Sequence, residues 1–355
     1  MKKVKKKTKK KLKKIITIAV ILIIILISIF AIIKIFNKIN DRKKTLSPND
    51  KEEVIKKPVE KKKVSIIDET SKSRPYAIMI NTHNGALPQA GLQNAYLVYE
   101  LVVEGGITRM MALFKDKDID KIGSVRSART QYLGYVYEND AIYFHAGGAL
   151  DAVNQMRNEG INNISVDGPY GFRDTSLNRA WEHKLFTSTS LMQKAISDRG
   201  FRTTTDLPNL FKYQAEPLDL GKYEDKQVAN NISIKYSYYR TSEYSYDENS
   251  KTYLRSMNGK PNTDLVTGDQ YKVKNIIAYP VRYTTYGGEY QRLDNIGSGE
   301  GYYFTEGYAI PITWQKDNEQ SQTKYKIKST NEDLILNDGN TYIQIYPNRE
   351  TINIS

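Results

Sequence analysis

The sequence has 355 residues, no cysteine and only three histidines. The absence of cysteine excludes disulfides, thiolate metal sites, a cysteine nucleophile and a lipid-modified cysteine. His83, His145 and His183 lack the i, i+4 or His-x-His spacing of a zinc site, so we predict no metal centre. Walker loops, dinucleotide-binding glycine motifs and nucleophile elbows are also missing from the sequence, so no cofactor is indicated.

Acidic residues are scarce at the N-terminus. Residues 1–44 contain fifteen Lys/Arg and a single acid, Asp41, while the whole chain has a formal net charge of +13. The basic character therefore belongs to this segment, and the remainder is close to neutral. Because nucleic-acid binding needs a basic surface on the folded part, we expect no nucleic-acid partner.

Residues 15–33 contain no charge and consist almost entirely of Ile, Leu, Val, Ala and Phe. A helix of this length spans about 28 Å, which matches the hydrocarbon core of a bilayer. A cleaved signal peptide has a shorter apolar region and a small-x-small cleavage site, which this segment lacks. We therefore predict an uncleaved signal-anchor, a single transmembrane helix over residues 15–36.

The orientation of this helix follows from its flanking charges. Ten lysines precede it and five basic residues follow it closely, and the side richer in Lys/Arg stays in the cytoplasm. Residues 1–14 are then a cytoplasmic Lys-rich tail, and the C-terminal bulk is extracytoplasmic. We expect residues 1–36 to contact membrane lipids, with the lysines attracted to anionic headgroups. This organisation is typical of a bacterial, Gram-positive-like cell envelope protein.

The rest of the chain divides into four parts by composition. Residues 37–74 are charged and poor in aromatics, which predicts a flexible linker. Residues 75–202 mix strand and helix patterns and residues 203–230 form a connector. Residues 231–355 are Tyr-rich with alternating polarity and frequent turn residues. The predicted fold class is α+β: an N-terminal mixed α/β domain and a mainly β C-terminal domain, on one N-terminal transmembrane helix.

Within the first domain the sequence predicts individual elements. Apolar runs of strand length lie at residues 76–81, 96–103, 110–114 and 141–145. Two helices are predicted, over residues 149–159 and 189–199, because each ends at a glycine and the second begins after Ser188.

Four stretches resemble the YerB-like family. They are PQAGLQNAYLVYELVVEGGITR (88–109), IGSVRSART (122–130), DAIYFHAGG (140–148) and the segment 172–188, with FRD and EHKLFTS; in residues 231–355, NGKPNTD and GSGEGYYF add to the likeness. The resemblance implies an extracytoplasmic two-domain protein, related mostly to lipoproteins of poorly characterised function. The chain departs from the family in carrying a membrane helix in place of the lipidated cysteine. It also has Thr130 where proline is usual, and Lys184 and Phe186 where Asn and Tyr are usual.

Basic side chains in these motifs are the principal site candidates. Arg126 and Arg129 would share a face on a helical turn, and with Arg109 they suit carboxylate or phosphate ligands. The alternative is a set of structural salt bridges to Glu100, Glu104 or Asp140. The secondary candidates within or beside the motifs are Asn81, His83, Glu100, Glu104, Ser127, Asp140 and Asp174.

The strand-to-helix turn after His145 is a second candidate feature. Gly147 and Gly148 would expose backbone N–H groups at a helix start, which favours anion binding, although glycine also serves such turns for steric reasons. Arg173, Asp174 and His183 could complete the pocket. Glu100 and Glu104, four apart on a strand, could form a glycosidase-like carboxylate pair or lie on an exposed edge.

Two functions remain open on the sequence alone. The first is binding of an anionic cell-wall polymer, or of an envelope partner protein, through the Arg/His pocket. The alternative is an enzyme that acts on cell-wall or lipid-linked phosphate substrates, in which arginines stabilise charge and Asp140 or Asp174 holds magnesium.

Overall fold

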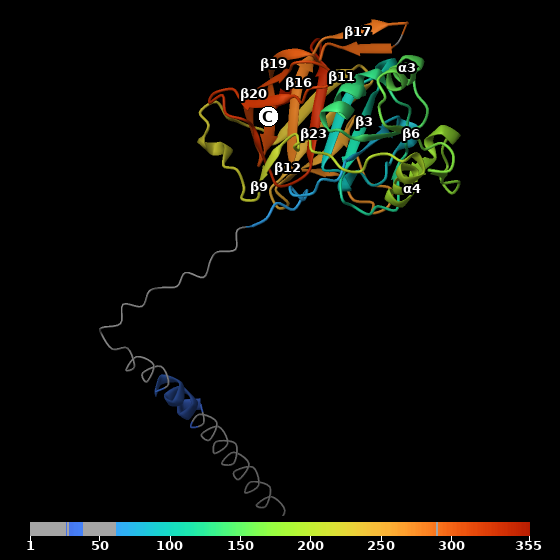
Figure 1. Ribbon diagram of the computed structural model, residues 1–355. Helices are drawn as coiled ribbons and strands as arrows, with labels where there is room; N and C mark the ends of the chain where they lie inside the picture. Colours follow the sequence, from blue (N-terminus) through green and yellow to red (C-terminus); the bar gives the residue numbers. More distant parts are fainter. Residues whose placement is uncertain (1–25, 27, 38–61, 289) are drawn as a thin grey trace, which may run out of the picture. The chain divides into compact units, whose positions relative to one another are not determined.

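The computed structural model describes residues 26, 28–37, 62–288 and 290–355. Residues 62–355 form one compact unit (Figure 1), and residues 1–61 are a separate unit. Most of the predicted membrane span, residues 15–25 and 27, lies outside the described residues. Residues 28–37 are helical. Among the residues that the structure describes, no helix is both long and apolar enough to cross a bilayer.

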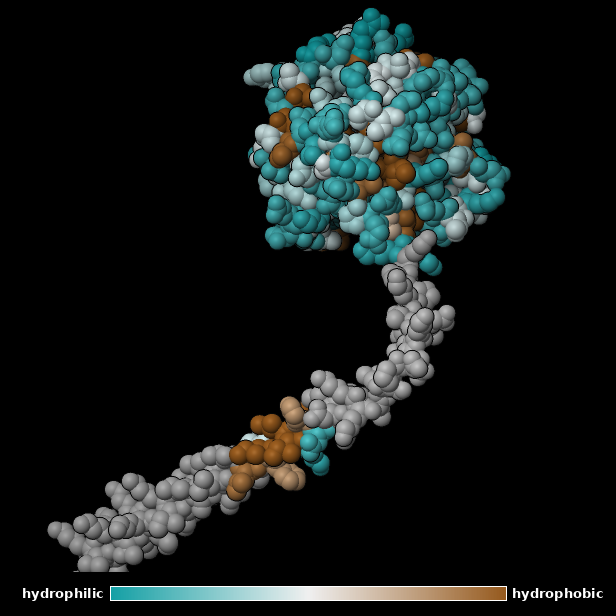
Figure 2. All heavy atoms as spheres, turned by 90° about the vertical axis from the view of Figure 1, so that its left-hand side faces the viewer, coloured by the Kyte–Doolittle hydropathy of each residue, from teal (hydrophilic) through white to brown (hydrophobic). Residues whose placement is uncertain are grey.

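The described part of that helix is apolar on its exposed surface. Leu26, Ile29, Phe30 and Phe36 are each between 48% and 71% exposed. Figure 2 shows these hydrophobic side chains along the short helix. Its described polar residues are Ser28, Lys34 and Asn37, so apolar side chains make up most of its surface.

The main sheet of the folded unit contains eleven described strands. In spatial order they are β10 (Gln227–Val228), β20 (Tyr308–Lys316), β19 (Gly297–Thr305), β16 (Asn275–Val281), β23 (Thr341–Pro347), β2 (Leu97–Val102), β3 (Thr108–Phe114), β1 (Tyr76–Asn81), β5 (Ile142–His145) and β6 (Asn163–Ser165), with β21 (Lys324–Ile327) paired to β20. Strand β23 pairs in parallel with both β2 and β16. One continuous sheet therefore joins the two sequence regions.

A second sheet is built from the C-terminal region. Its strands are β14 (Lys260–Pro261), β13 (Thr252–Met257), β12 (Arg240–Asp247), β11 (Asn231–Ser237) and β24 (Ile352–Ile354), with β15 (Lys272–Val273) paired to β13. Smaller pairs are formed by β17 (Tyr283–Tyr286) with β18 (Tyr290–Leu293) and by β9 (Lys212–Gln214) with β22 (Ile335–Asn337). The expectation of a mixed first region and a mainly β second region is confirmed.

The second sheet covers one face of the main sheet through polar contacts. Tyr236 of β11 donates to Gln344 Oε1 of β23 at 3.1 Å, and Ser242 of β12 donates to Glu100 of β2 at 3.1 Å. On the opposite face, Tyr99 of β2 donates to Glu138 Oε1 at 2.6 Å, at the end of α2 (Leu133–Glu138). The side chains of β2 therefore alternate between two buried environments.

Helices α3 (Leu150–Asn158) and α4 (Thr189–Arg199) lie toward the β6 edge of the sheet (Figure 1). The start of α4 is capped by Ser188, whose hydroxyl accepts from the Leu191 N–H. The helix ends at Gly200, which has a positive φ of 61°. Both helices were predicted to within one residue at each end, and for α4 the Ser188 and Gly200 caps are readable in the sequence.

Part of the predicted linker is folded. The carboxylate of Asp338 accepts hydrogen bonds from the backbone N–H groups of Ser65 and Ile66, at 3.0 and 2.9 Å. Ile67 is only 5% exposed. Residues 62–74 therefore belong to the compact unit, since their partners lie far away in the sequence and composition alone does not reveal them.

Candidate functional site

A small three-stranded sheet brings the sequence motifs together. It pairs β4 (Ile122–Gly123) with β8 (Leu185–Thr187), and β8 with β7 (Phe172–Arg173). The Val125 N–H donates to the Leu185 carbonyl at 2.8 Å, and the Arg126 N–H donates to the Met79 carbonyl at 2.9 Å. The segments 122–130 and 172–188 therefore meet at the end of β1.

Two of the three candidate arginines are paired with one carboxylate, that of Glu104. Arg109 Nη2 lies 2.6 Å from Glu104 Oε1, and Arg129 Nε donates to Glu104 Oε2 at 2.8 Å. Burial, together with the charge of Arg129, lowers the pKa of Arg109 to about 10 despite the opposing charge of Glu104. Burial opposes ionisation of Glu104, but the hydrogen bond from Arg129 and both arginine charges outweigh it and hold its pKa below the usual range. Arg109, Arg129 and Glu104 are thus a structural triad.

Arg126 is different from these two arginines. Its guanidinium is half-buried and makes no hydrogen bond or ion pair with any residue in the described part of the chain. Its charge nevertheless contributes to lowering the pKa values of Arg109, Glu182 and His183. Arg126 therefore lies within electrostatic reach of all three, with its donors unused. The helical turn suggested for residues 126–129 is wrong, because Arg129 has extended backbone angles.

His183 is held beside Arg126 by a polar frame. Its Nδ1 lies 3.0 Å from Asn81 Nδ2, which donates, so the neutral ring carries its proton on Nε2. The ring stacks on His83 with centroids 4.8 Å apart. A Cβ at Gly85 would lie 3.0 Å from His183 Cδ2, so this glycine permits the close approach. Burial lowers the pKa of His183, and the positive charge of His83 lowers it further.

The charge around His183 is predominantly positive. Arg179 also contributes to lowering the pKa of His183, and its guanidinium donates to the carbonyls of Ala86 and Pro88 at 2.9 and 3.0 Å. No carboxylate pairs with Arg179 among the described residues. Glu182 is the acid whose charge acts on His183 in the opposite direction. We define Asn81, His83, Arg126, Arg179, Glu182 and His183 as the Arg126 cluster.

The predicted anion cradle after His145 is not formed. His145 Nδ1 and Nε2 lie 2.8 Å from the Gly147 carbonyl and 3.1 Å from Asn163 Oδ1, and burial lowers the pKa of the ring. The N–H groups of Ala146 and Ala149 donate to the carbonyls of Arg126 and Ala128. Gly148 packs against Val153 and Ala128, so its role is steric. The Gly147 N–H donates to Ser165 Oγ at 3.4 Å, so the two glycine N–H groups do not form a shared anion cradle.

The acidic candidates are also committed to structural partners. Arg202 donates to both carboxylate oxygens of Asp140 at 2.8 Å, and Arg74 Nη2 lies 3.2 Å from Asp140 Oδ1. Burial opposes the charged form of Asp140, but these contacts outweigh it and lower the pKa of the carboxyl group. Lys121 lies 2.5 Å from Asp174, and this hydrogen bond lowers the pKa of Asp174 to about 2. Arg173 pairs with Asp167 and stacks on Trp181. Neither aspartate is available for a metal ion.

The suggested carboxylate pair is wrong. Glu100 is fully buried against Arg255 on the face of the second sheet, whereas Glu104 lies past the end of β2 in a turn and contacts Arg109. The strand ends at Val102, so the expected alternation does not continue to Glu104. Ser127 contributes its backbone carbonyl, which accepts from Arg109 at 2.5 Å.

A polar pocket elsewhere in the unit was missed by the sequence reasoning. It lies near the β17–β18 hairpin and is lined by Gln131, Asp151, Gln155, Arg292 and Glu319 among others. These residues are spread over nearly two hundred positions, and no local motif signals their convergence.

The fold is that of a two-region α+β protein. A smaller β-sheet covers one mixed sheet, and a basic cluster lies at the end of β1. Residues 64–202 match the family described as "Protein of unknown function (DUF3048) N-terminal domain", and residues 232–343 match its C-terminal domain. The chain belongs to this family.

The relative "Putative lipoprotein YerB" of Bacillus subtilis (strain 168) is 28% identical over 292 residues, which cover 79% of this chain and 84% of that protein. The crystal structure of the YerB protein from Bacillus subtilis matches with a TM-score of 0.68 and 25% identity, over 79% of this chain and 94% of that one. The resemblance to the YerB-like family is confirmed.

Proposed function

We propose that this chain is an extracytoplasmic envelope protein that residues 15–36 anchor in the cytoplasmic membrane. We further propose that it binds an anionic ligand, such as a wall polymer, through the Arg126 cluster. The Bacillus relative is named as a lipoprotein, which supports a membrane-attached location for this chain. This sequence contains no cysteine to carry a lipid. The apolar helix around residues 28–37 supports a protein anchor instead.

The observation that carries the binding proposal is the unpaired guanidinium of Arg126. Arg109 and Arg129 share Glu104, which compensates one of their two charges and occupies donors of both guanidinium groups. Glu182 is the acid that interacts with Arg126, and Asp174, which is already paired with Lys121, is the acid that acts on Arg179, so the cluster keeps a local excess of positive charge. A guanidinium with free donors suits phosphate or carboxylate oxygens, and partial burial strengthens the interaction.

The enzyme alternative gains no support from the described residues. A phosphotransferase of the suggested type needs a carboxylate that is free to hold magnesium. Asp140 is bound by Arg74 and Arg202, and Asp174 by Lys121 and Ser176. We therefore propose binding without turnover.

The test compares the full chain in mild detergent with its Arg126→Gln variant. Calorimetric titration with poly(glycerol phosphate) and with inorganic pyrophosphate should give an affinity that Arg126→Gln lowers by about tenfold, the expected loss of a charge-assisted contact. Arg157→Gln, which changes an exposed arginine of α3, is the matched control and should bind as the wild type does. Equal binding by Arg126→Gln, with an unchanged melting temperature, would refute the proposal.

A further inference from the structure

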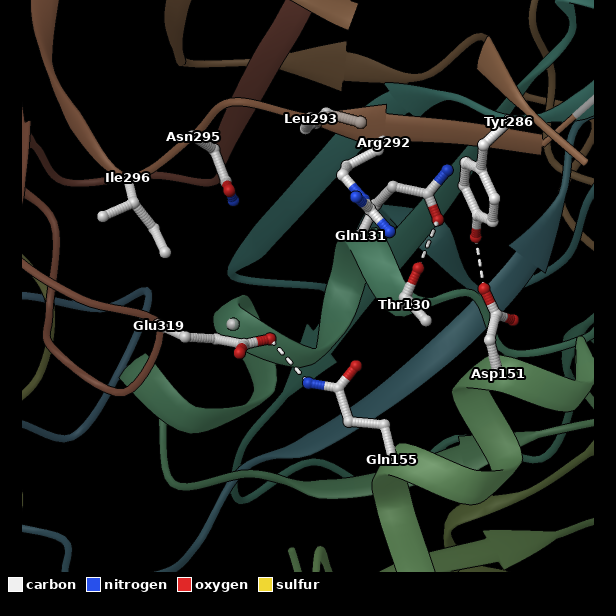
Figure 3. A pocket seen from close by; sticks show the side chains of 11 residues that line it. Thr130, Gln131, Asp151, Gln155, Tyr286, Arg292, Leu293, Asn295, Ile296 and Glu319 are labelled. Carbon is white, nitrogen blue, oxygen red and sulfur yellow. Dashed lines mark hydrogen bonds between the residues drawn. The ribbon is translucent and has the colours of Figure 1, made fainter. Parts of the chain in front are cut away.

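The pocket near the β17–β18 hairpin has a volume of about 360 Å³. It lies where the two sequence regions meet (Figure 3): Asp151 and Gln155 come from α3, and Tyr286 and Glu319 come from the C-terminal region. The Tyr286 hydroxyl donates to Asp151, and Gln155 Nε2 donates to Glu319 Oε1 at 2.9 Å. These two hydrogen bonds fix opposite walls, so the pocket is preformed. Such a volume fits a small ligand of one or two rings.

Gln131 brings a buried amide to this pocket. The residue is 8% exposed, and its Oε1 accepts from Thr130 Oγ1 at 3.5 Å. Its Nε2 has no hydrogen-bond partner in the described part of the chain, and Figure 3 shows this amide beside Arg292 at the pocket wall. The side chain is mostly buried, but Nε2 retains solvent contact, so a ligand acceptor would replace water at this donor.

Arg292 is a second donor without a hydrogen-bond acceptor in the described part of the chain. Its guanidinium lies 5.2 Å from the centroid of the Tyr286 ring and makes no hydrogen bond or ion pair with the described residues. Asn295 donates to the Tyr135 hydroxyl at 3.0 Å, which leaves its Oδ1 as an acceptor. Glu319 likewise keeps one oxygen beyond its bond to Gln155 (Figure 3). The lining therefore offers free donors and free acceptors side by side.

The charge of the pocket separates it from the Arg126 cluster. One guanidinium, Arg292, is opposed by the two carboxylates of Asp151 and Glu319, a formal balance of −1. Leu293 and Ile296 add an apolar wall. A polyanion would be repelled here, whereas a neutral ligand with many hydroxyl groups would find a partner for each group.

We propose that this pocket binds a neutral carbohydrate unit. Each sugar hydroxyl both donates and accepts, so it pairs well with planar amide, carboxylate and guanidinium groups such as Gln131, Glu319 and Arg292. The C–H face of the sugar ring would lie against Leu293 and Ile296. The site is independent of the Arg126 cluster and shares no residue with it.

The test uses the full chain in mild detergent and saturation-transfer NMR. The probes are chitotetraose and cellotetraose as neutral saccharides, with the dipeptide Ala-Ala and inorganic pyrophosphate as competing chemistries. We expect a neutral saccharide to bind with a Kd on the order of 1 mM or tighter, typical of a few hydrogen bonds without a large apolar contact. Arg292→Ala and Asn295→Ala should each weaken it at least about threefold, the effect of one lost hydrogen bond.

Arg282→Ala is the matched control. It removes an arginine that precedes β17 and pairs with Asp294, outside the pocket lining, and saccharide binding should not change. Arg126→Gln should also leave it unchanged, so failure of the anion proposal would not be confused with failure of this one. The proposal is overturned if neither saccharide gives saturation transfer at about 10 mM. It is also overturned if Arg292→Ala and Asn295→Ala bind the saccharide as the wild type does. Displacement of the saccharide by Ala-Ala or by pyrophosphate would overturn it as well.

Discussion

Arg255 Nη2 lies 2.9 Å from Glu100 Oε2, and both side chains are fully buried. Glu100 belongs to β2 of the first sequence region and Arg255 to β13 of the second. Thr108 and Ser242 donate to the same carboxylate at 2.7 and 3.1 Å. Burial opposes the charged form of Arg255, but the Glu100 carboxylate outweighs it and raises the pKa of the guanidinium. This ion pair joins the two sheets into one folding unit.

Glu100→Gln should therefore destabilise the whole unit. Removing one partner leaves Arg255 buried and uncompensated, which costs about 3–5 kcal/mol. The only two tryptophans, Trp181 and Trp314, report on the two regions separately. In Trp181→Phe and Trp314→Phe backgrounds, urea unfolding followed by fluorescence should give coincident midpoints, both shifted equally by Glu100→Gln. Separate midpoints would mean that the regions fold independently.

A double variant distinguishes the loss of charge balance from the loss of packing. Glu100→Leu combined with Arg255→Met removes both charges, and it should be more stable than Glu100→Gln alone because no uncompensated charge remains. The free energy of unfolding from urea titration is the measurement. A double variant less stable than the single one would show that the pair itself contributes most of the stability.

Asp140→Asn should destabilise the fold by about 1–3 kcal/mol. Arg74 is 5% exposed and would lose its nearest carboxylate. Asp140 has a positive φ of 46°, which asparagine tolerates, so the change removes charge without backbone strain. Asp206→Asn is the control, because its pair with Lys72 is fully exposed. A thermal melt of Asp140→Asn that matches the control would contradict the structural role of Asp140.

Acidification should destabilise the fold just below pH 6.5. Burial lowers the pKa of both His145 and His183 from the ordinary value of 6.5, so the unfolded chain takes up protons first as the pH falls. Their contribution to stability is present above pH 6.5 and is lost as the pH falls through the folded pKa values. Chemical denaturation at a series of pH values measures the slope of the unfolding free energy against pH, and His145→Gln should make this slope shallower. An unchanged slope in the variant would exclude His145 as its source.

The orientation of the chain is testable in wall-stripped cells of a Gram-positive host that express it. Protease added from outside should remove residues 62–355, because we place this unit outside the membrane. A tag fused before Met1 should survive the same treatment. Protection of the folded unit while surface control proteins are cut would refute the predicted topology.

Local sequence signals predicted much of the fold. The alternation and apolar runs located β1, β2, β3 and β5, and the Ser188 and Gly200 caps bounded α4. The sequence could not show that β23 inserts between β2 and β16. Strand β23 pairs in parallel with β2 across more than two hundred residues and with β16 across more than sixty, and such distant pairing leaves no local pattern. The shared sheet and the folded start of the unit at residues 62–74 follow from such distant contacts.

The candidate site was predicted in part. Residue type drew attention to Arg126 and His183, but it could not distinguish Arg126 from Arg109 and Arg129, which share Glu104. That distinction depends on the turn after β2, which places the Glu104 carboxylate in contact with both Arg109 and Arg129. His145 was misassigned because the partners of its ring, Gly147 and Asn163, become visible only when β5 pairs with β6.

The most direct test of an anion site at Arg126 is the ring pKa of His183, measured by NMR on the full chain, whose three histidines can be assigned by substitution. Without ligand, the pKa of His183 should lie below 6.5, and Arg126→Gln should raise it because one nearby positive charge is lost. Pyrophosphate at a concentration that half-saturates the wild type should raise the pKa of His183 there, and should raise it much less in Arg126→Gln, whose affinity we expect to be about tenfold lower. A pKa that pyrophosphate does not move in the wild type, or moves equally in both proteins, would contradict the account.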